Sequence, residues 1–181
     1  MPVQPLRPDE PRREIPNPGF GDDDGSTPAA VATALRAYAQ EPLDGRYQVV
    51  AALQASRVLV PVVAILGEVE YDEHGHAHDK SSDMATVLTT APDGRKGMLA
   101  FTSMDTMAAW DPQARPVATT LQIAAASGIQ DGAAALVIDL AGPHQLVIEG
   151  DELTYVADGL RLIRVDDGWA WARVGGRVTN P

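Results

Sequence analysis

The sequence contains no cysteine, and lysine occurs only twice. Without cysteine the chain has no disulfide, no thiol nucleophile and no cysteine-ligated metal. Long hydrophobic runs are also missing, because the longest one, residues 58–66, is interrupted by Pro61 and falls short of the roughly 20 residues that a membrane-spanning helix needs. The N-terminus is rich in proline and has no apolar core of signal-peptide length. We therefore expect a cytoplasmic protein that does not bind membranes.

Basic residues are scarce relative to acidic ones. The 181 residues include 14 Lys and Arg against 25 Asp and Glu, so the formal net charge is −11. A surface this acidic repels phosphate groups, so nucleic acid is not an expected partner. Hydrophobic residues make up 45% of the chain, which is ordinary for a globular protein and is enough for one domain with a tail.

The composition divides the chain into a tail and one domain. Residues 1–25 are rich in proline and aspartate, and such a segment buries too little surface to offset the entropy of ordering it. Ile15 and Phe20 are exceptions in this tail and could anchor it to the domain or to a partner. We assign residues 26–181 to the domain, with a core over 46–150 and a C-terminal helix and hairpin over 151–175.

The first part of the domain reads as two helices and a strand. Ser26, Thr27 and Pro28 predict the start of a helix over 28–40, since Ser or Thr can cap a helix and proline suits its first position. Residues 42–45 predict a break, followed by a second helix over 46–56. The β-branched run at 58–66 predicts a buried strand, in which Pro61 marks an edge or a bulge.

The remainder alternates between strands and short helices. The pattern predicts strands at 85–90 and 98–102 joined by a hairpin turn at Pro92-Asp93-Gly94. It also predicts a helix capped by Ser103, with Asp105 in its first turn, and a helix closed by Gly128. The other elements are strands at 117–120, 134–140 and 144–149, a helix at 151–157 and a hairpin over 161–174 that turns at Asp167-Gly168. The sum is a single α/β (α+β) domain, with a mixed sheet, packed helices and two helices at its N-terminus.

Three histidines form the most metal-like pattern in the chain. His74, His76 and His78 alternate with small residues, so in an extended chain their imidazoles point to one side and could bind zinc or nickel. Gly75 favours a turn instead, and structural zinc sites usually draw ligands from separate elements. The alternative is a solvated polar loop.

A second candidate site lies immediately downstream. Lys80, Ser81, Ser82 and Asp83 place a serine beside a lysine, but no glycine-serine elbow or oxyanion hole accompanies the pair. A loop-to-strand junction explains the same residues, because Ser and Asp side chains bond free backbone groups there. Lys80 also follows an acidic stretch, which makes an ion pair or a partner contact plausible.

Several strings resemble one family. Arg57 to Val63 resembles the opening of the SseB-type (enhanced serine sensitivity) N-terminal domain, and three further strings follow in family order. They are Leu99 to Ser103 with Trp110, Pro116-Val117, and Ala134 to Pro143. Ile15 to Phe20 and Lys80 to Ala85 resemble the form of this family found in high-GC bacteria. The sequence departs at Leu140, where proline often follows the aspartate, and the longer relatives' second domain is not expected here.

The resemblance implies an α/β domain with no established enzyme activity and no cofactor. We therefore expect a non-enzymatic module that contacts an unknown protein partner, with a homodimer left open. The predicted contact surface joins Lys80–Asp83 to Phe101, Thr102 and Ser103. The alternative is a protein that binds a small molecule, such as an amino acid, or a divalent metal, at Lys80, Ser82 and Asp83 or at the three histidines.

Overall fold

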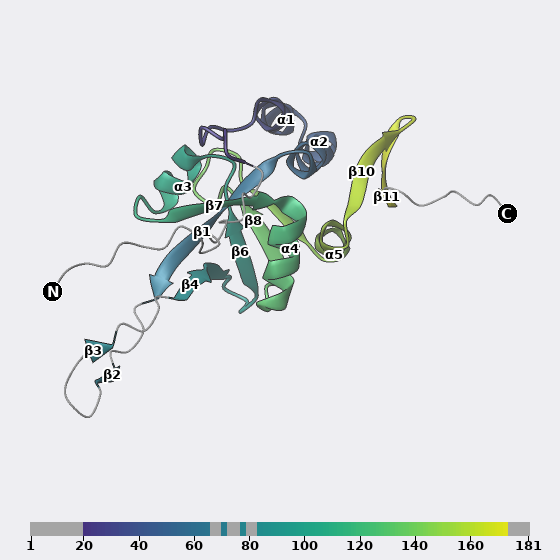
Figure 1. The fold of residues 1–181 in the computed structure, drawn as a ribbon. Coiled ribbons are helices and arrows are strands. Elements are labelled where there is room, and N and C mark those ends of the chain that lie inside the picture. The colour runs from purple at the N-terminus through teal and green to yellow at the C-terminus, as the bar shows by residue number, and fades with distance from the viewer. Residues whose placement is uncertain (1–19, 66–69, 72–76, 79–82, 174–181) are drawn as a thin grey trace, which may run out of the picture.

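The protein is described from a computed structural model that covers residues 20–65, 70–71, 77–78 and 83–173, with side-chain detail for 20–62 and 86–173. Figure 1 shows a twisted sheet with helices packed on it, two helices at the start of the domain and a hairpin at its end. The fold class is α+β, as the sequence predicts. No helix within the described ranges is long and apolar enough to cross a bilayer.

The two N-terminal helices are α1 (Ala29–Gln40) and α2 (Pro42–Gln54). The predicted cap is wrong: Pro28 is the N-cap residue of α1, and no side chain caps the helix. The predicted break is present but shorter: only Glu41 separates the two helices, because α2 already starts at Pro42, where a missing N–H costs nothing. Gly45 is buried inside α2, since a Cβ there would lie 2.4 Å from the Tyr38 Cα of α1. The glycine is thus a helix-packing residue.

Strand β1 (Arg57–Ile65) lies between β4 (Asp83–Thr86) and β7 (Arg115–Thr120), and both pairings are antiparallel. Pro61 therefore lies in an interior strand, opposite Pro116 of β7. Leu59 exchanges two backbone hydrogen bonds of 2.8 Å with Phe101 at the edge of β1 away from β7. The backbone nitrogen of Pro61, two residues later, points to that same edge. Along this edge Leu59 pairs with Phe101, whereas β4 pairs with β1 only from Val62 onward. Pro61 lies between these two pairings, so its missing N–H breaks no hydrogen bond of the sheet.

A second sheet continues from the Leu59–Phe101 bridge. Its order is β5-β6-β8-β9, with β6 and β8 parallel and the outer pairs antiparallel. The predicted hairpin around Asp93-Gly94 joins β5 to β6, but the predicted strand at 85–90 is divided, since residues 83–86 pair with β1. The strands are β5 (Leu88–Thr90), β6 (Lys96–Ala100), β8 (Ala135–Ile138) and β9 (Leu146–Glu149).

Alternate residues of the central strands fill two separate cores. Met98 and Ala100 of β6 face the larger core, with α1, α2, α4 (Leu121–Gln130) and α5 (Asp151–Ala157). Leu99 and Phe101 face the smaller core, with α3 (Met104–Trp110). Helix α4 continues past Gly128, which was predicted to end it. Gly128 is buried against Met98 instead.

The chain ends in the predicted hairpin, formed by β10 (Leu160–Val165) and β11 (Gly168–Arg173), but the turn is Asp166-Asp167, one residue before the predicted Asp167-Gly168. Its main helix contacts are made by β10 with α2 and α5, and Figure 1 shows β11 on the outer side of the hairpin. A smaller pairing joins β2 (Glu70–Tyr71) to β3 (Ala77–His78).

Candidate functional site

Two strings that carry the family resemblance meet where parallel strands β6 and β8 end. The carboxylate of Asp139 accepts hydrogen bonds from the Thr102 backbone N–H at 2.8 Å and from the Thr102 hydroxyl at 2.7 Å. Asp139 is only 2% exposed and has a φ of +52°, a conformation that aspartate tolerates better than most residues. The Thr102 hydroxyl is therefore already engaged inside the protein.

Arg57, at the start of β1, extends this network toward the N-terminus. Its guanidinium is 4% exposed and donates to the carboxylate of Asp23 and to the carbonyls of Ser26 and Thr102. The hydrogen bond from Arg57 is the main reason that the pKa of Asp23 lies below its usual value. Because the buried charge is paired and its donors are used, the network is a closed structural unit.

The network holds residues 20–27 against the domain. The Met104 N–H donates to the Gly25 carbonyl at 2.8 Å, next to the Asp23–Arg57 ion pair. Gly25 has a φ of +79°, and a Cβ there would lie 2.5 Å from the Met104 Cγ, so only glycine fits. Thus Phe20 to Gly25, which the sequence assigned to the tail, pack on the domain.

The predicted contact residues in this region are buried. Phe101 is fully buried and stacks on Trp110 with ring centroids 5.6 Å apart. Thr102 bonds to Asp139, and Ser103 forms a capping box with Thr106 at the start of α3, as its sequence position predicts. The hypothesis that Phe101, Thr102 and Ser103 form a contact surface needs correction, because long-range packing covers them. They position β6 and α3 instead.

Other candidate residues fall outside the described part of the chain. Lys80, Ser81, Ser82, His74, His76 and Ile15 lie outside it, and for Asp83 and His78 only the backbone in β4 and β3 is described. The predicted metal and lysine-serine sites therefore stay predictions. Within the described residues, no three His, Asp or Glu side chains are arranged to hold a metal ion.

A hollow opens beside residues 20–27, on the side of the sheet that carries α3. Its floor is apolar, with Leu59 and Ala118 from neighbouring strands and Met104, which is 39% exposed, from α3. The volume is about 280 Å³, and a wider depression of about 530 Å³ adjoins it along residues 20–28 and 55–57. The lining residues of the hollow are Phe20, Asp23, Asp24, Gly25, Leu59, Met104, Pro116 and Ala118.

The rim of this hollow is negatively charged. Asp24 accepts hydrogen bonds from the side chain and backbone of Ser26, which lower the pKa of its carboxyl below the usual value. Asp22 lines the adjoining depression and is exposed. An apolar floor with ionised carboxylates beside it suits a ligand that is both apolar and cationic. We call the residues that line the hollow, together with Asp22, the groove.

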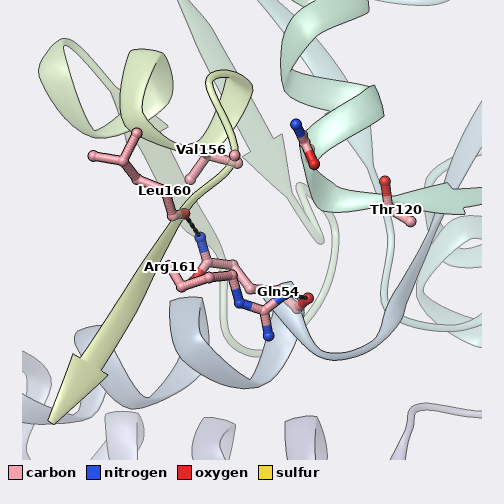
Figure 2. A pocket seen from close by; sticks show the side chains of 7 residues that line it. Gln54, Thr120, Val156, Leu160 and Arg161 are labelled. Atoms are coloured by element: carbon pink, nitrogen blue, oxygen red, sulfur yellow. Dashed lines mark hydrogen bonds between the residues drawn. The ribbon is translucent and has the colours of Figure 1, made fainter. Parts of the chain in front are cut away.

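A smaller pocket lies between α2, α4, α5 and β10 (Figure 2). Its volume is about 100 Å³, below the several hundred that ligand sites usually have. Figure 2 shows the Gln54 amide bonded to the Leu160 carbonyl, at 2.7 Å, and the Arg161 guanidinium donates to the Gln54 carbonyl at 2.8 Å. These polar groups are used to dock the C-terminal hairpin.

Comparison with known proteins identifies the family. The family profile described as the SseB protein N-terminal domain matches residues 31–154. The chain belongs to this family. No curated protein and no solved structure matches the chain. The SseB domain so defined contains Arg57, Thr102 and Asp139, whereas the segment 20–27 and the β10–β11 hairpin lie outside the matched range.

Sequence reasoning missed most of the groove in this SseB domain. Arg57 and Asp139 were noticed only as parts of resembling strings, and Met104, Pro116 and Ala118 carried no functional signal. A sequence signal for Arg57 did exist, because a charged residue at the start of a continuous apolar strand needs a partner. Its partner, Asp23, is 34 residues away, and only the fold brings the two together.

Proposed function

We propose that this SseB domain is a non-enzymatic module that binds another protein through the groove. The observation that carries the proposal is an apolar hollow, in which the exposed Met104 lies over the buried Leu59 and the partly buried Ala118, with an acidic rim beside it. Single exposed apolar residues are common, but an apolar hollow rimmed by charge is typical of a binding surface. Its partner would present a segment with apolar and basic side chains, since these match the floor and the rim.

The hydroxyl groups near the groove support a role without catalysis. A serine nucleophile needs a base within hydrogen-bond reach and donors for an oxyanion. The Ser103 hydroxyl bonds to Thr106, and the Thr102 hydroxyl bonds to Asp139, so both serve the fold. Purified protein that turned over serine or an activated ester would contradict this proposal.

Site-specific cross-linking tests the groove directly. A photoreactive benzoylphenylalanine would replace Met104, in cells that express the protein natively, and Ile123 of α4 would carry the same group as a matched control. We expect one defined protein to be cross-linked from position 104 and not from 123. Adding Asp22→Asn and Asp24→Asn should weaken this product, and raising the salt concentration should do the same. Equal products from both positions, or none from 104, would overturn the proposal.

Calorimetry separates the small-ligand alternative from this one. Zinc, nickel and serine are titrated into the purified full-length chain. Saturable binding that survives Met104→Lys but is lost in a variant with His74, His76 and His78 all changed to Ala would favour a metal-binding protein. No heat from any of the three, together with a groove-specific cross-link, supports the interaction module.

A further inference from the structure

The outer edge of the C-terminal hairpin is open, whereas the edges of β9 and β10 are blocked by side chains of α2. Strand β9 is closed by Arg46, which donates to the Val147 carbonyl at 2.8 Å. Strand β10 is closed by Gln54, whose amide bonds to the Leu160 carbonyl at 2.7 Å and to the Leu162 N–H at 2.8 Å. Such capping prevents an edge strand from pairing with another chain.

Two further edges are protected by composition or length. Strand β7 carries Pro116, and β5 has only three residues. Strand β11 has six residues and no proline, and no described strand or side chain bonds to its outer edge. Its sequence, Gly-Trp-Ala-Trp-Ala-Arg, is apolar except at the end. A long, unblocked apolar edge is a template for pairing with another strand.

The register identifies the backbone groups at this edge. Asp166 and Asp167 form a two-residue turn, so the flanking pair Val165–Gly168 is a hydrogen-bonded one. Pairs alternate from there, and the outward N–H and C=O groups of β11 belong to Trp169, Trp171 and Arg173. The capped edge of β10 agrees, because Leu162, which bonds to Gln54, is the partner of Trp171.

One face of the hairpin is docked on the domain and the other is not. Trp169 donates its indole N–H to Asp44 at 2.9 Å, and Trp171 packs on Tyr155 with ring centroids 5.5 Å apart. On the other face, Ile163 and Val165 are 43% and 46% exposed. A two-stranded sheet is marginal by itself, and further strands would continue this apolar face.

We propose that β11 pairs antiparallel with β11 of a second copy of this chain, which makes a four-stranded sheet across a two-fold axis. With the axis at Trp171, each outward residue meets another outward residue, so Trp171 pairs with itself and Trp169 with Arg173. That cross-strand contact of a guanidinium and an indole already exists within the hairpin, where Arg164 lies 5.6 Å from the Trp169 ring centroid. The strand is thus chemically complementary to itself in this register.

Local charge and position also favour a second copy. The chain as a whole is strongly acidic, so most of its faces repel a copy of themselves. Residues 160–173 are the exception, because Arg161, Arg164 and Arg173 nearly balance Asp166 and Asp167, so the segment is close to neutral and repels a copy of itself only weakly. The helices pack mainly on β10, and Figure 1 shows β11 facing away from them, which leaves its edge accessible.

Cysteine cross-linking tests this register, because the natural chain has no cysteine. In the proposed pairing Ala170 faces Ala172 of the second copy in a non-hydrogen-bonded pair, where Cα atoms are about 4.5 Å apart, within disulfide range. Mixing Ala170→Cys and Ala172→Cys chains under mild oxidation should give a disulfide-linked dimer. Each variant by itself should give much less, since identical positions lie diagonally at about 7–8 Å.

Sedimentation tests the assembly without cysteine. The wild-type chain should show a concentration-dependent dimer. Arg173→Pro should sediment as a monomer, because it removes an outward N–H and no bond to β10, whereas Arg173→Lys keeps that N–H and should remain dimeric. Unchanged tryptophan fluorescence would show that the hairpin stays docked. A monomeric wild type, or cross-linking in the mixture no greater than in the single variants, overturns the proposal.

Discussion

Thr102 donates both its backbone N–H and its hydroxyl to the carboxylate of Asp139, across 37 residues of sequence. The pair joins the ends of parallel strands β6 and β8 and is buried. Through the Thr102 carbonyl it reaches Arg57, and through Arg57 it reaches Asp23, next to the groove. Thr102 and Asp139 thus support the groove from behind, whereas Leu59 and Pro116, from two other family strings, belong to its lining.

Replacing Asp139 should destabilise the protein in a graded way. Asp139→Ala leaves the buried Thr102 N–H without an acceptor and puts alanine at a positive φ that aspartate tolerates better, so we expect a loss of about 2–4 kcal/mol in the free energy of unfolding. Asp139→Gly should lose about 1 kcal/mol less, because it removes the backbone strain. Asp139→Asn should lose least. Urea unfolding measures all three, and equal losses would contradict this account.

Arg57 should control the segment 20–27. Arg57→Met leaves Asp23 and two carbonyls without their donor, which typically costs about 3–5 kcal/mol for a buried pair. Hydrogen exchange should increase at the Met104 amide, whose acceptor is the Gly25 carbonyl. Asp23→Asn is the matched control: it keeps the carbonyl contacts of Arg57 and should expose the segment less. Unchanged exchange in both variants would show that Arg57 does not hold it.

The docking of the hairpin should weaken in acid through Asp44. The hydrogen bond from the Trp169 indole, then that from Gln48, and the nearby Arg164 charge hold the pKa of Asp44 below its ordinary value of 3.8. A lowered pKa in the folded state means that this stabilisation is complete above pH 3.8 and is lost as the pH falls through the lower value. Trp169 fluorescence in a Trp110→Phe, Trp171→Phe background should report the change.

Asp44→Asn provides the control for this titration. The amide oxygen still accepts the indole hydrogen bond but does not titrate in this range, so the acid transition of Trp169 should disappear. The same transition in the wild type and in Asp44→Asn would assign it to a different group.

Two helical glycines should respond differently to alanine. Gly45→Ala should destabilise the protein by more than about 2 kcal/mol, because the new Cβ meets backbone atoms of α1, although alanine favours a helix by about 1 kcal/mol. Gly128→Ala should cost much less, since its Cβ would lie 3.3 Å from the Met98 Cβ and 3.4 Å from the Met98 Sδ, a crowding that a shift of the helix by a few tenths of an ångström relieves. Thermal unfolding compares the two, and a stable Gly45→Ala would contradict the close packing of α1 and α2.

Several elements were predictable because their signals are local. Ser103 and Thr106 form a capping box within three residues, and Asp93-Gly94 lies in a short turn between strands. The second hairpin was predictable as well, although its turn lies one residue earlier than predicted, at Asp166-Asp167. A cap or a turn is formed by neighbouring backbone groups, so the sequence determines it without reference to the rest of the chain. The same holds for the helix over 151–157 and for the fold class.

The candidate site was not predictable in this way, and the errors share a cause. Gly45 and Gly128 look like helix breakers, but inside helices they allow close packing against Tyr38 and Met98. Phe101 to Ser103 look like a contact surface in the sequence, and packing buries them. Which side chain is covered depends on segments far away in the sequence.

The sequence by itself determined the acidic composition, the absence of thiol chemistry, the fold class, the family resemblance and the locally capped or turned elements. Tertiary structure decided which residues are exposed. It pairs Arg57 with Asp23, hollows the groove between β1, β7 and α3, and closes the β9 and β10 edges with Arg46 and Gln54 while β11 stays open within the described structure. Capping and turn formation act over a few residues, whereas burial and strand-edge closure are properties of distant segments brought together.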